Sequence, residues 1–192
     1  MDIRYVIVRP SRAARLGVAS LVLAATLIAA PTTAAADAAP DVTVKAAFLY
    51  NFAKFAEWPA LLPAAPLVVC IVGSDAIAAA FVETVHGQQV AGHLLEVWRP
   101  QNGGSWRTCN LLFVADLESR QLAKGLIEIK TLPVLTVGDG KGFSQSGGII
   151  ELYLEGGKMR FSVNLDAAER AGIRLSSRLL TLAKIIRSGH GQ

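Results

Sequence analysis

A short, wholly apolar run begins at residue 67 and reads Leu67-Val68-Val69-Cys70-Ile71-Val72-Gly73. Such a run, ended by glycine, is typical of a strand that is buried on both faces of a parallel sheet. Ser74-Asp75 then opens a predicted helix over residues 76–85, which Gly87 ends. This segment therefore predicts the first strand and helix of an alternating fold.

The alternation continues on the carboxyl side of this unit. Further strands are predicted at about residues 90–98, 110–115 and 134–137, and a second helix is predicted over residues 119–130. Strands that alternate with helices of 10 to 13 residues favour βαβ units and a mainly parallel sheet.

The last third of the chain follows a different pattern. Residues 149–155 and 158–164 alternate apolar and polar side chains around Gly156-Gly157, which predicts an antiparallel hairpin. Asp166 is predicted to begin a short helix, and Ser176 or Ser177 a final one. The inward face of that final helix is expected to consist of Leu179, Leu182, Ala183 and Ile186. Together the patterns predict a single Rossmann/flavodoxin-like α/β domain, with a mainly parallel sheet flanked by helices and an antiparallel C-terminal edge hairpin.

On the amino side, Asp41 can cap a helix over residues 42–57 that stops before Pro59. Three- and four-residue steps place one group of side chains on a common face, namely Val44, Phe48, Asn51, Phe52 and Phe55. Tyr50 projects elsewhere and Trp58 lies at the helix end. Core packing explains most of these aromatic residues, but Tyr50 and Trp58 are also candidates for a partner-binding surface. Leu152 and Leu154 on the hairpin are a second candidate, because an edge hairpin can add strands to a partner.

Residues 1–36 are predicted to be a cleavable secretory signal. Four arginines precede an uncharged apolar run at residues 16–30, and Ala34-Ala35-Ala36 supplies small residues for cleavage. The apolar run is shorter than the about 20 residues that a spanning helix needs. An uncleaved membrane anchor is the alternative; after cleavage, no direct membrane span is expected.

The signal accounts for most of the basic character of the chain. The whole sequence of 192 residues has 19 Lys and Arg against 15 Asp and Glu, a formal net charge of +4. Without residues 1–36, 15 basic and 14 acidic residues remain. A net charge of +1 does not indicate a nucleic-acid-binding protein, which needs a sustained cationic field.

Cys70 and Cys109 are the two cysteines of the chain. Export favours a disulfide between them, provided that their strands are neighbours. Two buried free thiols are the alternative, because cysteine packs well as a small apolar residue.

The sequence contains no recognisable catalytic or metal-binding motif. The histidines are widely spaced, and the loop Gly138-Asp139-Gly140-Lys141-Gly142 lacks the spacing of a phosphate-binding loop. We therefore expect no catalytic residues, metal or cofactor. Ser74, Asp116 and Asp139 each follow a predicted strand, which makes them candidates for a small-ligand crevice, although such residues more often cap helices.

Two long motifs resemble the YfiR-like family. The first is Val44-Lys45-Ala46-Ala47-Phe48-Leu49-Tyr50-Asn51-Phe52-Ala53-Lys54-Phe55-Ala56-Glu57-Trp58-Pro59. The second combines Gly147-Gly148-Ile149-Ile150, Phe161-Ser162-Val163-Asn164-Leu165-Asp166-Ala167-Ala168-Glu169-Arg170-Ala171-Gly172 and Leu175-Ser176-Ser177. The resemblance covers about residues 42–187, which we take as the domain, and leaves residues 188–192 as a predicted flexible tail.

The resemblance implies a periplasmic regulator that binds the periplasmic domain of an inner-membrane diguanylate cyclase and holds it inactive. Such inhibition lowers cyclic di-GMP and biofilm formation. It also implies a structural disulfide at positions that Cys70 and Cys109 match. A second, labile cysteine pair found in some members has no counterpart here, because the chain has two cysteines. The alternative function is a periplasmic small-molecule sensor, and the sequence leaves open whether the chain forms a homodimer.

Overall fold

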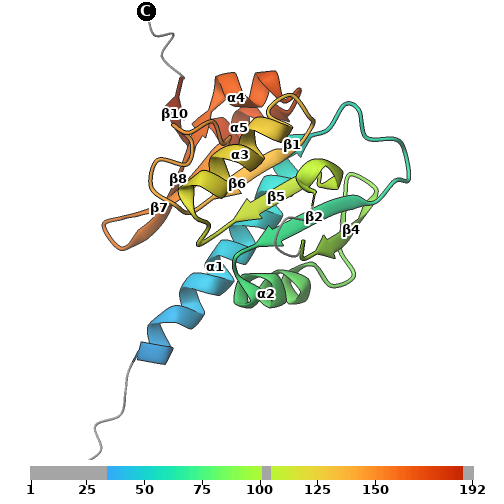
Figure 1. Cartoon of the computed structure of the whole chain (residues 1–192). Coiled ribbons are helices and arrows are strands. Elements are labelled where there is room, and N and C mark those ends of the chain that lie inside the picture. The colour runs from blue at the N-terminus through green and yellow to red at the C-terminus, as the bar shows by residue number, and fades with distance from the viewer. Residues whose placement is uncertain (1–33, 101–104, 188–192) are drawn as a thin grey trace, which may run out of the picture. The chain divides into compact units, whose positions relative to one another are not determined.

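An eight-stranded sheet forms the centre of the fold (Figure 1). The computed structural model describes residues 34–100 and 105–187, with side chains from Asp41 onward. Its strands are β2 (Leu67–Val72), β3 (Gln89–Val90), β4 (His93–Trp98), β5 (Leu111–Val114), β6 (Leu135–Gly138), β7 (Ile150–Glu155), β8 (Lys158–Asn164) and β10 (Lys184–Ile186). A separate antiparallel pair is formed by β1 (Ala56–Glu57) and β9 (Arg174–Leu175).

The order of the strands across the sheet is β10-β8-β7-β6-β5-β2-β4-β3. The pairs from β4 through β2, β5 and β6 to β7 are all parallel, and β7 pairs antiparallel with β8. Numbered along the chain, the five strands from β4 to β7 have the order 2-1-3-4-5, which is the flavodoxin-like arrangement. The predicted fold class, a mainly parallel α/β sheet with an antiparallel hairpin, is confirmed.

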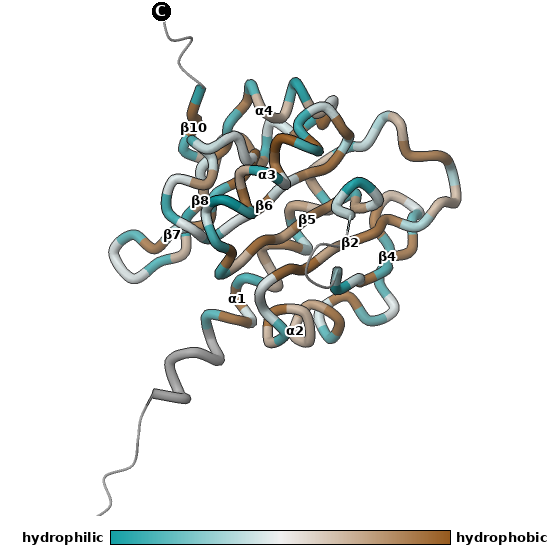
Figure 2. The backbone as a smooth tube through the Cα atoms, in the orientation of Figure 1, coloured by the Kyte–Doolittle hydropathy of each residue, from teal (hydrophilic) through white to brown (hydrophobic). Residues whose placement is uncertain are grey.

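Helices cover both faces of this sheet. The helices are α1 (Ala34–Phe55), α2 (Asp75–Val85), α3 (Ser119–Ile129), α4 (Leu165–Arg170) and α5 (Ser177–Leu180), with a 3-10 turn, η1 (Trp106–Thr108). Phe52 of α1 and Phe81 of α2 belong to the larger core, whereas Leu126 of α3 packs with Cys70 and Leu112 in a smaller core. Figure 2 shows β2 and β5 as apolar segments between these layers, as expected of strands buried on both faces.

The predicted hairpin is present but is not wholly at the edge of the sheet. β10 pairs in parallel with β8, so that Lys184 lies opposite Ser162 and Ile186 lies opposite Asn164. β10 therefore covers the C-terminal end of β8, away from the hairpin turn. The predicted final helix is correspondingly wrong beyond Leu180, and Leu182 is exposed. Pairing with an otherwise open strand edge outweighs the helical spacing of this segment.

The first helix begins earlier than predicted, and it buries a different set of side chains. Because α1 begins at Ala34, Asp41 lies inside the helix and does not cap it. The alanine-rich segment before Asp41 has high intrinsic helix propensity, which extends the helix backwards. Val44 and Asn51 are exposed, whereas Phe52 is buried as predicted, together with Ala46, Leu49 and Ala53.

Two further boundaries change in the structure. The strand predicted at residues 90–98 is two antiparallel strands, β3 and β4, joined by a tight turn in which Ala91 and Gly92 have φ of 51° and 87°. The cap of α4 is Asn164, whose side chain accepts a hydrogen bond from the Ala167 N–H, and not Asp166.

The predicted signal at residues 1–36 lies outside the described residues except for its last three backbone positions, and the predicted tail at residues 188–192 lies wholly outside them. Among the helices that the structure describes, none combines the length and the apolar character that a membrane span requires.

Candidate functional site

Cys70 and Cys109 form a disulfide with a Cα–Cα distance of 5.8 Å. Cys70 lies in β2, and Cys109 lies two residues before the neighbouring strand β5, which brings the two cysteines into bonding range. Both cysteines are buried in the smaller core. The disulfide is therefore a structural link between adjacent strands.

The strand ends that carry Ser74, Asp116 and Asp139 do meet at one edge of the sheet. Val72, Val114 and Gly138 lie in register on the adjacent parallel strands β2, β5 and β6. Among the described residues, Asp139 lines the pocket presented below, whose walls do not include Ser74 or Asp116. Ser74 caps α2 by accepting a hydrogen bond from the Ile77 N–H, and Asp116 is exposed in a left-handed conformation with φ of 47°.

Two backbone turns lie in close contact beside Ser74 and Asp116. A Cβ atom placed on Gly73 would lie 1.7 Å from the Ala115 carbonyl oxygen. The turns that follow β2 and β5 therefore pack directly on each other, at the point where ligands usually bind in this sheet order. Asp139, the third residue of the predicted crevice, lines a pocket.

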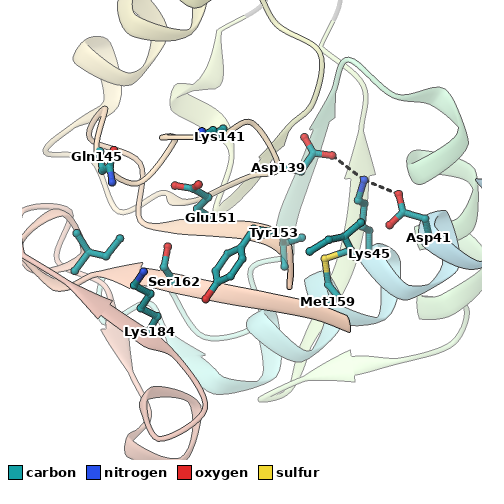
Figure 3. Close-up of a pocket in the computed structure, with 13 residues that line it drawn as sticks. Asp41, Lys45, Asp139, Lys141, Gln145, Glu151, Tyr153, Met159, Ser162 and Lys184 are labelled. Atoms are coloured by element: carbon teal, nitrogen blue, oxygen red, sulfur yellow. Dashed lines mark hydrogen bonds and ion pairs between the residues drawn. The ribbon is translucent and has the colours of Figure 1, made fainter. Parts of the chain in front are cut away.

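That pocket has a volume of about 490 Å³ and lies on the hairpin side of the sheet (Figure 3). Its walls come from α1, the loop at residues 139–148, β7, β8 and β10. The charged residues in the walls are Asp41, Lys45, Asp139, Lys141, Glu151 and Lys184. We refer to it below as the hairpin pocket.

Lys45 closes one end of the hairpin pocket. Its ammonium group lies 2.7 Å from the Asp41 carboxylate and 2.9 Å from that of Asp139 (Figure 3). Burial lowers the pKa of Lys45, but hydrogen bonds and charge attraction from Asp41 and Asp139 outweigh it and raise the pKa above 10.5. Lys45 thus joins α1 to the end of β6 as a permanent cation at neutral pH.

Glu151 anchors the loop at residues 139–148, which forms one wall of the hairpin pocket. Its carboxylate accepts hydrogen bonds from the Gly142 N–H at 3.0 Å, the Ser144 N–H at 3.0 Å and the Ser144 hydroxyl at 2.8 Å. Three donors satisfy much of the hydrogen-bonding capacity of this carboxylate. The loop is therefore bound to β7 along its middle.

A buried polar chain continues from Glu151 into the sheet. The Ser144 hydroxyl lies 3.2 Å from that of Ser162, and the Asn164 amide donates to the Ser144 carbonyl at 2.7 Å. Ser144, Ser162 and Asn164 are all buried. These residues have no predicted role, although Ser162 and Asn164 belong to the second family-like motif. In the alternating pattern of β8, their polar side chains are indistinguishable from those of a solvent-exposed face.

The candidate partner surface is only partly exposed. Trp58 is 8% exposed and its indole N–H donates to the Asn110 carbonyl at 2.9 Å, while Leu152 is 1% exposed. Neither residue offers a surface, because Trp58 packs in the larger core and the side chain of Leu152 points inward from β7. Tyr50 is half-buried with its hydroxyl 3.2 Å from Gln88, and Leu154 is 66% exposed.

The acidic residues of the hairpin pocket do not form a metal site. Within the part of the chain that the structure describes, no three His, Cys, Asp or Glu side chains are grouped closely enough to hold a metal ion. The three carboxylates of the pocket are instead bound by Lys45 and by the loop donors described above.

The fold and the pocket define a small α/β domain with a flavodoxin-like sheet. A disulfide links two adjacent strands of this sheet, and a C-terminal hairpin extends it. The family model described as YfiR/HmsC-like matches residues 42–184, and the chain belongs to this family. The family consists of periplasmic regulators of diguanylate cyclases and is regulatory rather than catalytic.

Among solved structures, the chain is similar to a conserved domain protein from Vibrio cholerae, with 12% sequence identity and a TM-score of 0.45. The match covers 75% of this chain and 59% of that protein, so this chain spans less than two thirds of its length.

Proposed function

We propose that this protein is a non-catalytic periplasmic regulator that inhibits an inner-membrane diguanylate cyclase by binding its periplasmic domain. The observation that carries the proposal is membership of the YfiR/HmsC-like family over residues 42–184. The disulfide agrees with an oxidising compartment outside the cytoplasm. Inhibition requires that the protein bind the inactive conformation of the cyclase more tightly than the active one.

The outer half of the β7–β8 hairpin is the part of the molecule that best suits this contact. It projects from the body of the domain (Figure 1) and exposes Leu154. Among the described residues, β10 pairs with β8 only at Ser162–Asn164, which leaves the edge of β8 at Lys158–Phe161 without a second strand. An apolar side chain beside an open strand edge favours pairing with an extended segment of a partner.

Deleting the gene is the direct test. Cyclic di-GMP and surface attachment should rise in the deletion strain, and the wild-type gene should restore both. An unchanged cyclic di-GMP level in the deletion strain would contradict the proposal.

A variant pair locates the contact. Leu154→Asp should fail to restore the low cyclic di-GMP level, because a charge on the hairpin disfavours an apolar contact. Leu62→Asp is the matched control, since Leu62 is also exposed but lies in the connection between β1 and β2. Immunoblots of periplasmic fractions should show equal amounts of both variants; equal restoration by both would exclude the hairpin as the contact.

The hairpin pocket favours a second candidate function, a periplasmic small-molecule sensor. A cavity of about 490 Å³ with both charged and apolar walls has the size and character of many ligand sites. Purified protein should show an increased melting temperature with at least one periplasmic metabolite, because a ligand that binds only the folded state stabilises it. A screen without any stabilising compound would count against this function.

A further inference from the structure

Among the described residues, two of the six charges in the hairpin pocket have no protein partner. Asp41 and Asp139 both bind Lys45, and Glu151 accepts three hydrogen bonds. Within residues 34–100 and 105–187, the ammonium groups of Lys141 and Lys184 take part in no ion pair or hydrogen bond. The positive groups are thus available to a ligand, whereas the negative groups are already engaged.

The two lysines reach the pocket from different elements. Lys141 comes from the loop that Glu151 holds in place, and Lys184 comes from β10. In Figure 3 they lie on either side of Glu151. Two ammonium groups that approach from different sides can bind one anionic group together, each through charge-assisted hydrogen bonds.

The balance of charge favours a ligand with one negative charge. Three lysines and three carboxylates line the pocket, so its formal charges cancel. A ligand with several negative charges would be repelled by the three carboxylates of the pocket. A ligand with a single carboxylate can pair with both lysines and adds only one negative charge to the pocket.

The remaining wall of the pocket suits an apolar body. It includes Tyr153, Leu154, Met159 and Ile186. The phenol ring of Tyr153 and the thioether of Met159 offer polarisable surfaces that contact flat ligands well.

We infer that the hairpin pocket binds a small monocarboxylate with an aromatic or aliphatic body, whose carboxylate is held by Lys141 and Lys184. The inference rests on the second candidate function, ligand binding in this pocket. Because Leu154 lines this pocket and is also the proposed contact residue, the experiments use the purified protein without a cyclase.

Three probes test the class of ligand by NMR titration of the purified protein. Phenylacetate should bind saturably with a dissociation constant of about 1 mM and shift the amide signals of Lys141, Tyr153 and Lys184. The neutral 2-phenylethanol should bind at least about tenfold more weakly, since it lacks the carboxylate. Acetate should also bind at least about tenfold more weakly, since it lacks the apolar body.

Variants then assign the carboxylate contact. Lys141→Gln and Lys184→Gln should each weaken phenylacetate binding by about three- to tenfold with an unchanged urea midpoint, because both lysines are exposed. Lys124→Gln on α3 is the matched control, as an exposed lysine outside the pocket, and should bind like the wild type.

Three outcomes would overturn the inference. If 2-phenylethanol binds in the pocket as well as phenylacetate, the pocket takes ligands of another class and the second candidate function survives. If neither probe shifts the pocket amides, both the inference and that function lose their support. If Lys124→Gln weakens binding as much as the pocket variants do, the attraction is non-specific.

Discussion

Cys70 and Cys109 show how single residues constrain this chain. The disulfide between them closes a segment with a sequence separation of 39, and it joins two neighbouring strands of the sheet. In the chain-entropy model, a loop of this size stabilises the folded state by roughly 4 kcal/mol, because the cross-link restricts the unfolded chain.

Cys70→Ser should therefore lower the free energy of unfolding by about 4 kcal/mol, as measured by urea denaturation. The remaining Cys109 is buried, so its thiol should react with an alkylating agent in denaturant but slowly in the folded protein. Alkylation of both cysteines in the unreduced, denatured wild-type protein would contradict the disulfide.

Lys45 is a second residue whose removal has a defined consequence. Its side chain is 16% exposed and is held by Asp41 and Asp139, so Lys45→Met leaves two carboxylates without their cation. We expect a loss of about 1–3 kcal/mol in the free energy of unfolding at pH 8. Lys124→Met, at an exposed position on α3, should change this free energy by less than about 0.5 kcal/mol.

The pH dependence of the Lys45 effect has a definite sign. Because the pKa of Lys45 is raised in the folded state, its contribution is fully present below the ordinary value of 10.5. It is lost as the pH rises through the higher pKa of the folded protein. The difference in stability between wild type and Lys45→Met should stay constant from pH 7 to about pH 10 and shrink above that; a difference that grows above pH 10 would be inconsistent with the ion pairs.

At the scale of elements, the loop between β6 and β7 depends on glycines that accommodate one aromatic ring. A Cβ atom on Gly148 would lie 2.1 Å from the Phe143 ring, and one on Gly138 would lie 2.4 Å from it. Phe143 is buried in the smaller core, so its ring has little room to move away.

Gly148→Ala should therefore destabilise the protein by about 1–3 kcal/mol in urea denaturation. Gly140→Ala in the same loop is the control, because a Cβ atom on Gly140 would have no neighbouring atom within 4 Å, and it should change stability by less than about 0.5 kcal/mol. Replacing Phe143 with Leu in the Gly148→Ala background should recover part of the loss, since a smaller side chain relieves the overlap; no recovery would point to a backbone effect instead.

At the scale of the whole molecule, β10 protects an otherwise open edge of the sheet. It pairs with β8 at Ser162–Asn164, next to the buried polar chain of Ser144 and Asn164. Without this strand, the backbone groups of β8 would be available to other chains.

Truncation after Ala183, which removes β10, should lower the melting temperature and cause self-association in size-exclusion chromatography. Truncation after Arg187 is the control, because it retains all of β10. Monomeric behaviour of the shorter chain at the wild-type melting temperature would show that β10 does not protect this edge.

The type and order of most elements could be predicted from the sequence because they depend on local patterns. The apolar run at residues 67–73 and the Gly156-Gly157 turn carry their own periodicity and turn chemistry, and both structures are confirmed. The disulfide could be predicted only on the condition that the two strands are neighbours, and the tertiary structure supplied that adjacency.

The tertiary structure alone determined which of these residues face one another. Leu182 has helical spacing yet follows α5 into the turn before β10, and Trp58 is buried where Asn110, 52 residues away, accepts its hydrogen bond. The hairpin pocket likewise joins Lys45, Asp139 and Lys184 from distant segments. Periodicity describes neighbours within one element, whereas burial, ion pairs and cavities arise from contacts between elements, which only the packing of the folded chain specifies.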